Sequence, residues 1–203
     1  MNNNNHEYDD EYDDEYDLSK AQIIGLVLLV VAMFFIYNKF FKDDSPPLPI
    51  QQQRFVDTVH LYMEKADDAK NVIQKEALRK ERARALMTKP GSLMVDNWYG
   101  EIVEIDTSST GDAILTVEIA DNIQVQTNNA IFFDLNDKSM ITKGSDTYNS
   151  LMQLEEGQKV IFSGRFYFNK LDYAEEQSAT LDGSMYDPEY LFKFSAIAPA
   201  PTN

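Results

Sequence analysis

The sequence predicts an α+β membrane protein, with an N-terminal transmembrane helix and a long helical stalk followed by a small five-stranded β-barrel. Three observations support this fold class. An uncharged apolar block lies near the N-terminus, a segment without Gly or Pro follows it, and the last half of the chain alternates apolar and polar residues between turn residues. The chain has 203 residues, which suits one ordinary domain with appendages.

Residues 1–20 form an acidic tail that holds eight acids and one lysine. Within it, residues 7–17 repeat the pattern Glu-Tyr-Asp-Asp. Such a segment buries too little apolar surface to offset the entropy of ordering, so we expect it to be disordered. Its function stays open between a solvated low-complexity tail and a short recognition motif for a basic partner.

Residues 21–41 are predicted to form a transmembrane helix. The stretch Ala21–Asn38 is uncharged and close to the ~20 residues that span a bilayer core. Aromatic residues and two lysines, Lys39 and Lys42, follow at one end, as at a membrane interface. An acidic preceding region argues against a signal peptide, and the lack of a polar face argues against a core helix.

Charge next to this helix predicts its orientation. One base, Lys20, precedes the helix, whereas Lys39, Lys42 and Arg54 follow it. The positive-inside rule then places the β domain in the cytoplasm and the acidic tail outside. The margin is small, so a periplasmic or other extracytoplasmic β domain stays open as the alternative.

A Pro-rich spacer, residues 42–49, separates this span from the predicted stalk, residues 50–89. Gln51–Met87 contains no Gly or Pro, which predicts one helix of about 55 Å at 1.5 Å per residue. Its basic end, Leu78–Lys89, is expected to pair with the acidic domain that follows or to favour the helix dipole, and contact with anionic lipid headgroups is the alternative.

Apolar residues in the stalk recur at spacings of four and three, which predicts one apolar stripe. The residues are Phe55, Val59, Tyr62, Ala66, Ala69 and Ile73. A seven-residue repeat of this length allows a short coiled coil, and hence a homo-oligomer through the stalk. The alternative is one helix that packs its stripe on its own β domain.

Residues 92–198 are predicted to form the barrel, and residues 199–203 a disordered C-terminus. The expected strands are Asn97–Ile105, Ala113–Ile119, Ile123–Thr127, Lys159–Phe168 and Glu189–Ile197. More extended sequence is expected at Ala130–Asp134, a short helix at Thr147–Leu154, and a long loop at Asn169–Pro188. Gly164 lies where a barrel strand would bend. Three strands, a short helix and two strands is the order of the oligonucleotide/oligosaccharide-binding (OB) barrel.

Several motifs of this region resemble those of bacterial membrane-anchored OB-fold domain proteins with a tRNA-anticodon-like β-barrel. They are Trp98-Tyr99-Gly100-Glu101-Ile102, Gly157-Gln158-Lys159-Val160, Phe162-Ser163-Gly164, Gln177-Ser178-Ala179-Thr180 and Pro188-Glu189-Tyr190-Leu191-Phe192. The resemblance covers about half of the chain and implies a fold. It implies no activity, because OB barrels bind nucleic acids, sugars, peptides or nothing.

The sequence offers no catalytic, cofactor or metal site, so we do not expect an enzyme. There is no cysteine, and the two histidines lie in the tail and the stalk. Phosphate-loop, dinucleotide-binding and nucleophile-elbow motifs are missing. The frame Ser178–Glu189 has the spacing of a calcium loop but lacks its first two carboxylates, so we interpret it as a plain acidic loop.

The predicted function is a non-catalytic binding or adaptor module that engages a protein or peptide partner. Residues 91–203 carry a net charge of −12, which repels phosphate backbones and disfavours nucleic acid. The candidate contact residues are Trp98, Tyr99, Tyr173 and Tyr186. The remaining aromatics are expected in the core, namely Phe162, Phe166, Phe168, Tyr190, Phe192 and Phe194. An extracytoplasmic domain for a small ligand or glycan is the alternative.

Overall fold

The computed structural model describes residues 23, 29, 47–86, 93–129, 134–135 and 138–201. The chain divides into two units, Met1–Ser45 and Pro46–Asn203. The predicted acidic tail, nearly all of the predicted span, most of the spacer and most of Ala130–Asp134 lie outside the described residues. Within the ranges that the structure does describe, no helix has the length and apolar character needed to cross a membrane.

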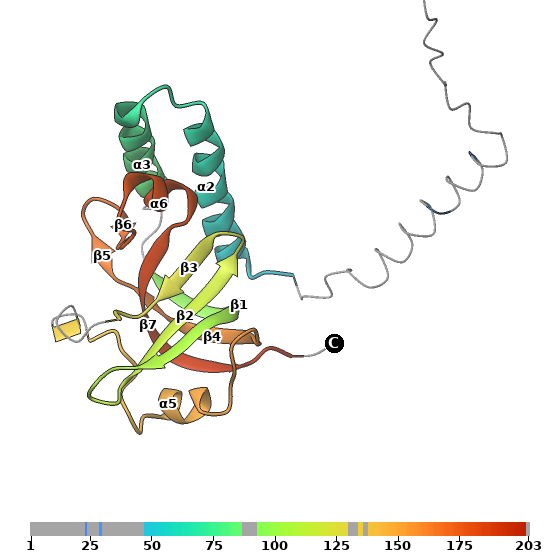
Figure 1. Cartoon of the computed structure of the whole chain (residues 1–203), viewed down its shortest axis with the longest axis vertical. Helices are drawn as coiled ribbons and strands as arrows, with labels where there is room; N and C mark the ends of the chain where they lie inside the picture. Colours follow the sequence, from blue (N-terminus) through green and yellow to red (C-terminus); the bar gives the residue numbers. More distant parts are fainter. Residues whose placement is uncertain are drawn as a thin grey trace, which may run out of the picture. The chain divides into compact units, whose positions relative to one another are not determined.

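The unit Pro46–Asn203 is an α+β fold built on a closed five-stranded barrel (Figure 1). The strands follow one another around the barrel in the order β1-β2-β3-β7-β4. Neighbours are antiparallel except β3 and β7, which are parallel. The bounds are β1 (Met94–Thr107), β2 (Ala113–Ala120), β3 (Ile123–Gln126), β4 (Lys159–Phe166) and β7 (Glu189–Pro199). All five predicted strands are therefore confirmed, with small shifts at their ends.

Alternation along the strands fills the barrel with aromatic side chains. On β4 and β7, Phe162 lies with its ring centre 5.6 Å from that of Phe192 and 5.4 Å from that of Phe194. Five of the six predicted core aromatics are buried. The prediction is wrong for Phe168, which is 54% exposed. Its strand ends at Phe166, and Phe168 begins a separate strand outside the barrel.

Gly164 marks a bend in β4, as predicted. The register of β4 against β7 shifts between Ser163 and Gly164. A Cβ atom at Gly164 would lie in hard contact with the backbone oxygen of Lys193 and the ring of Phe192. Glycine thus allows the two backbones to approach closely where the barrel closes.

The predicted short helix is confirmed as α5 (Asp146–Leu151), which follows β3 in the chain and precedes β4. Ser145 caps it, because its hydroxyl accepts a hydrogen bond from the Tyr148 amide at 3.2 Å. Leu151 is buried in the core cluster. The helix lies at the end of the barrel away from α2 and α3 (Figure 1).

The predicted single stalk helix is wrong, because residues 50–86 form a helical hairpin. It consists of α2 (Ile50–Asp67) and α3 (Val72–Leu86). The turn between them ends at Asn71, whose side-chain oxygen accepts hydrogen bonds from the amides of Ile73 (3.0 Å) and Gln74 (3.1 Å). This is an N-cap, and Asn71 with Gln74 three residues later is a signature of a helix start that does not need Gly or Pro.

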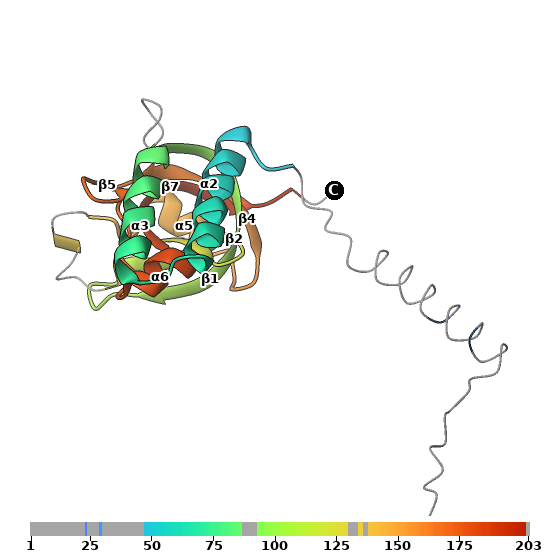
Figure 2. The same ribbon diagram turned by 90° about the horizontal axis from the view of Figure 1, so that it is seen from above.

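The coiled-coil prediction is also wrong for the first part of the apolar stripe. Phe55, Val59, Tyr62 and Ala66 are buried within the chain's own fold. Phe55 and Val59 belong to the same core cluster as the barrel interior. Figure 2 shows α2 and α3 side by side over the barrel. The alternative, a helix that packs its stripe on its own β domain, is confirmed.

The segment predicted as a long loop, Asn169–Pro188, carries its own structure. It contains the end of β5 (Phe168–Asn169), β6 (Tyr173–Ala174) and α6 (Leu181–Tyr186). The Thr180 hydroxyl caps α6 by accepting a hydrogen bond from the Gly183 amide at 2.9 Å. The residues of the supposed calcium frame therefore serve to start and hold a short helix.

Candidate interaction face

Two of the four predicted contact residues lie beneath α2. Trp98 is 1% exposed, with its ring 5.4 Å from that of Phe55, so it is not accessible to a partner. Tyr99 is half-buried, and its backbone is held by Gln52. The Gln52 side chain accepts a hydrogen bond from the Tyr99 amide (2.9 Å) and donates one to the Tyr99 carbonyl (2.6 Å). Gln52, which sequence reasoning missed, thus fixes α2 to β1.

The other two predicted residues, Tyr173 and Tyr186, lie in the segment between β4 and β7. Tyr173 is half-buried, with a backbone φ of 65° and its ring edge-on to Phe168 at 5.9 Å. Tyr186 is half-buried on α6, and the Lys75 ammonium of α3 lies 4.9 Å from its ring centre. Lys75 also pairs with Asp182 at 2.6 Å, which raises the pKa of Lys75. The helical hairpin therefore covers one face of Tyr186.

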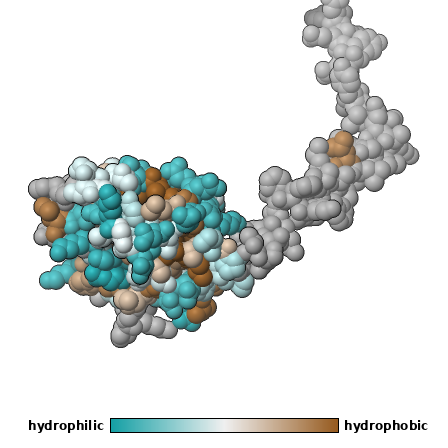
Figure 3. Space-filling model, turned by 90° about the horizontal axis from the view of Figure 1, so that it is seen from below, coloured by the Kyte–Doolittle hydropathy of each residue, from teal (hydrophilic) through white to brown (hydrophobic). Residues whose placement is uncertain are grey.

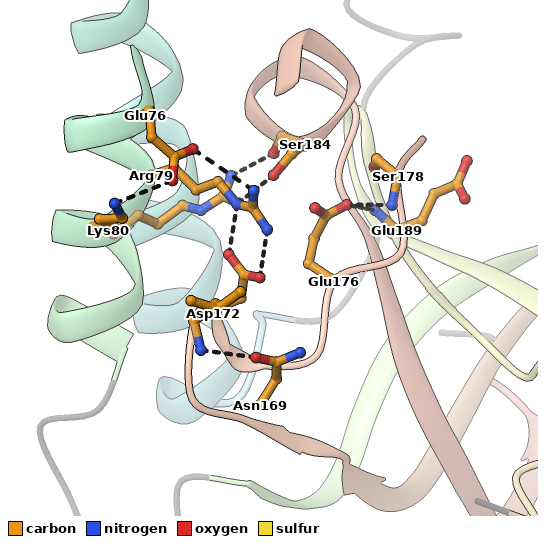
Figure 4. A network of polar contacts seen from close by, with 11 residues as sticks. Glu76, Arg79, Lys80, Asn169, Asp172, Glu176, Ser178, Ser184 and Glu189 are labelled. Atoms are coloured by element: carbon orange, nitrogen blue, oxygen red, sulfur yellow. Dashed lines mark hydrogen bonds and ion pairs between the residues drawn. The ribbon is translucent and has the colours of Figure 1, made fainter. Parts of the chain in front are cut away.

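A bidentate ion pair joins α3 to the turn between β5 and β6 (Figure 4). Arg79 donates from Nε to Asp172 at 2.7 Å and from Nη2 at 2.6 Å. Asp172 is 4% exposed, and its carboxylate raises the pKa of the Arg79 guanidinium. The two parallel hydrogen bonds fix the orientation of the Arg79 guanidinium relative to the Asp172 carboxylate, in addition to the attraction between their charges. The predicted pairing of the basic helix end with the acidic domain is confirmed at this contact.

Arg82, one turn further along α3, is buried against α6 and β7. It donates hydrogen bonds to the Ser184 carbonyl at 2.7 Å and to the Ser184 hydroxyl at 3.2 Å. Its guanidinium lies 5.9 Å from the ring centre of Tyr190. The loop between the fourth and fifth barrel strands, a usual ligand rim of OB barrels, is thus occupied by the chain's own helices.

The mouth of the barrel under α2 contains two polar groups without a hydrogen-bond partner in the described part of the chain. They are the indole nitrogen of Trp98 and the hydroxyl of Tyr190, and both rings contact Phe55. Burial raises the pKa of the Tyr190 phenol to about 12, although the nearby Arg82 acts in the opposite direction. The phenol therefore stays neutral at physiological pH.

We expect Tyr190→Phe to preserve or raise stability at neutral pH, by up to about 1 kcal/mol, because the hydroxyl makes no compensating hydrogen bond. In alkali the wild type should lose stability. An unfolded tyrosine loses its proton near pH 10, but the buried one keeps it to about 12, so the free energy of unfolding falls between these values by roughly 2 kcal/mol.

Urea unfolding on both sides of this window, at about pH 9 and about pH 11.5, measures the effect. The other tyrosines titrate in both proteins, so the informative quantity is the difference between wild type and Tyr190→Phe. An equal loss of stability in both proteins would mean that Tyr190 does not titrate as its burial implies.

The outer face of the barrel carries a row of carboxylates and an amide across four strands. Glu101 on β1 pairs in register with Glu118 on β2, Glu118 pairs with Gln124 on β3, and Gln124 pairs with Glu189 on β7. Register partners project to the same side of a sheet. We call these four residues the acidic row, and Lys159 on β4 follows Glu101 at its end.

Local contacts hold two members of the acidic row in place. Glu189 accepts a hydrogen bond from the Gln126 side chain at 2.9 Å, and Glu118 accepts one from the Asn122 amide at 3.3 Å. Glu101 and Glu118 lie directly opposite each other, an arrangement that costs stability when both are charged. A fold tolerates such a pair more readily if a ligand of opposite charge compensates it.

Seen from below, the described part of the surface is mainly hydrophilic with apolar residues among the polar ones (Figure 3). Among the described residues, no group of three or more His, Cys, Asp or Glu is arranged to hold a metal ion. What the acidic row offers is multiple hydrogen-bond acceptors and negative charge. Such groups attract cations and accept hydrogen bonds from them.

Comparisons with protein families, with curated proteins and with solved structures find no match to this chain. The resemblance of its motifs to membrane-anchored OB-fold domains therefore stays a prediction.

Proposed function

We propose that the chain is a single-pass membrane protein whose OB-type barrel is a non-catalytic module for a basic protein or peptide partner. The strand order supports the OB type, because the first three strands form a meander and the fifth main strand, β7, lies between β3 and β4. The helix α5 follows the third strand in the chain, as in that fold. Anchoring rests on the apolar block Ala21–Asn38.

The acidic row carries the proposal. It lies on the strands that OB barrels use for their ligands, whereas their usual rim loop packs against α3. Strands β2 and β3 present Glu118, Gln124 and Gln126 outward, without an aromatic or a base, whereas Thr116 on the same side of β2 is buried. Nucleic-acid binding needs both, so charge and chemistry favour a cationic polypeptide. The positive-inside rule places the barrel in the cytoplasm.

Binding of a lysine-rich peptide to the full-length protein in neutral detergent tests this function. Fluorescence anisotropy should show binding at low salt that weakens as salt rises. The variant Glu101→Gln/Glu118→Gln/Glu189→Gln should weaken it about tenfold, since exposed ion pairs each contribute up to about 1 kcal/mol. A glutamate-rich peptide of equal length should not bind.

A matched control removes the same charge elsewhere. Asp146→Asn/Glu155→Gln/Glu156→Gln changes three exposed acids at and after α5. This control should bind the peptide almost as well as the wild type. Equal losses in the two triple variants would show a general charge effect and would reject the acidic row as the binding face.

A further inference from the structure

A small apolar surface lies where the chain enters the folded unit. Ile50, the first residue of α2, is 67% exposed, and Met94, the first residue of β1, is 60% exposed. The start of α2 lies beside the start of β1, because the side chain of Gln51 donates a hydrogen bond to the Met94 carbonyl at 2.7 Å. Nothing in the described part of the chain covers these two side chains.

Two bases extend this surface across the barrel. Met94 pairs in register with Arg165 on β4, and Arg165 pairs with Lys193 on β7. Side chains of residues in register project to the same side of a sheet. The side chains of Met94, Arg165 and Lys193 therefore share the outer side of the barrel. Ile50, Met94, Arg165 and Lys193 form what we call the tether patch. The acid nearest along β1 is the exposed Asp96, which accepts a hydrogen bond from Ser163.

The tether patch is unusual in a segment this acidic. Residues 91–203 hold eighteen acids and six bases, and two of those bases follow Met94 in register, Arg165 on β4 and Lys193 on β7. The Lys193 ammonium also donates a hydrogen bond to the Lys138 carbonyl at 2.7 Å. Arg165 is exposed and stacks on the Tyr167 ring at 4.7 Å, which holds its guanidinium at the surface. Apolar side chains flanked by cations are typical of surfaces that meet phospholipid headgroups.

Covalent geometry limits how far the tether patch can lie from the membrane. This step rests on the proposed anchoring. The predicted span ends at Phe41 and α2 begins at Ile50, so residues 42–49 are the whole connection. Eight residues reach at most about 30 Å when fully extended. Because residues 50–86 fold back as a hairpin, no 55 Å stalk holds the barrel away from the bilayer.

We propose that the tether patch rests on the surface of the phospholipid bilayer that holds the chain's own span. Ile50 and Met94 insert at the headgroup boundary, and Arg165 and Lys193 lie near lipid phosphates. Along β1, Glu101 of the acidic row lies seven residues from Met94, or about 23 Å. Docking through the tether patch therefore leaves the acidic row open to a protein partner and away from the anionic lipid.

Site-directed fluorescence of the full-length chain in bilayers with anionic phospholipid tests this docking. The chain has no cysteine, so a single cysteine carries one environment-sensitive dye. The dye at Met94→Cys should be quenched by lipids spin-labelled at the headgroup. The dye at Met152→Cys, a 67% exposed position that follows α5, should not be quenched. A third label, at Leu29→Cys near the middle of the predicted span, is read with lipids spin-labelled deep in the acyl chain and reports whether the span lies in the bilayer.

Charge removal provides the second arm. In the Met94→Cys background, Arg165→Gln/Lys193→Gln should lower the ratio of docked to undocked barrel about thirtyfold, since each base near an anionic surface contributes about fivefold. The control Lys143→Gln/Lys159→Gln removes two bases elsewhere on the barrel and should leave quenching unchanged. Circular dichroism of each variant shows whether the fold is kept.

Each outcome decides the proposal. Docking is overturned if the dyes at positions 94 and 152 are quenched equally. It is also overturned if the dye at 94 is not quenched while the dye at Leu29→Cys is, and in that case the membrane anchor stands. Quenching at 94 that does not respond to loss of Arg165 and Lys193 overturns the tether patch as its cause. Absence of quenching at Leu29→Cys overturns the anchor, and the docking with it.

Discussion

Phe55→Ala should lower the free energy of unfolding by about 3–5 kcal/mol, because it removes the side chain that closes the barrel mouth. The Phe55 ring contacts three others, with centres 5.4 Å from Trp98, 4.9 Å from Phe166 and 5.2 Å from Tyr190. Its loss leaves a cavity lined by aromatic rings and weakens the attachment of α2. Trp98 and Tyr190 would then gain access to water.

Urea unfolding of the full-length protein in detergent measures this loss. Trp98 is the single tryptophan of the chain, so its emission reports directly on the barrel mouth. Leu61→Ala on the same helix is the matched control, since Leu61 is 47% exposed and should cost well under 1 kcal/mol. If the two variants unfold at the same urea concentration, α2 does not contribute to the barrel core as the structure shows.

Gly164→Ala should cost about 3 kcal/mol or more, despite adding one methyl group. The new Cβ would collide with the backbone oxygen of Lys193, which cannot move without breaking the pairing of β4 and β7. It would also press on the Phe192 ring, which is fully buried. The barrel would have to open locally or shift its register.

Thermal unfolding of Gly164→Ala against Gly183→Ala tests this. A Cβ at Gly183, on α6, would lie 3.2 Å from side-chain atoms of Ser178 and Thr180, so small movements can accommodate it. We expect a much smaller change there. A stable Gly164→Ala protein with native circular dichroism would contradict the close backbone approach at the bend of β4.

The strands could be predicted because each one is visible in local sequence. Phe162 and Phe166 are followed and preceded by the polar Ser163 and Arg165, and this alternation becomes the inward and outward faces of β4. The helix cap at Ser145 and the bend at Gly164 are likewise indicated by single residues of the local sequence. The core position of the aromatics followed from the same alternation, apart from Phe168.

The absence of Gly and Pro from residues 51–87 predicts one continuous helix and gives no sign of the helical hairpin. The N-cap at Asn71 was a readable signal of a break, reinforced by Gln74. The apolar stripe is ambiguous in principle. One amphipathic face buries equally well against another helix or against a barrel mouth, and the choice depends on which surface is available.

The candidate interaction face was missed for a different reason. The acidic row joins Glu101, Glu118, Gln124 and Glu189 from four strands, and their alignment depends on pairing registers. Registers depend on bulges, such as the shift between Ile102 and Glu104, that no single strand reveals. For the predicted contact aromatic Trp98, the local sequence does not show that it is buried, because the helix that covers it, α2, is far away in the sequence.

By itself the sequence determined the α+β composition, the order of the five barrel strands, the absence of cysteine chemistry and the acidity of the domain. Periodicity and composition are local or additive properties, so they can be read without knowing contacts. Three features appear only in the folded chain: α2 and α3 fold back over the barrel, Arg79 pairs with Asp172, and particular side chains come together on one surface. These depend on long-range packing, where the burial of one element is set by the shape and charge of another.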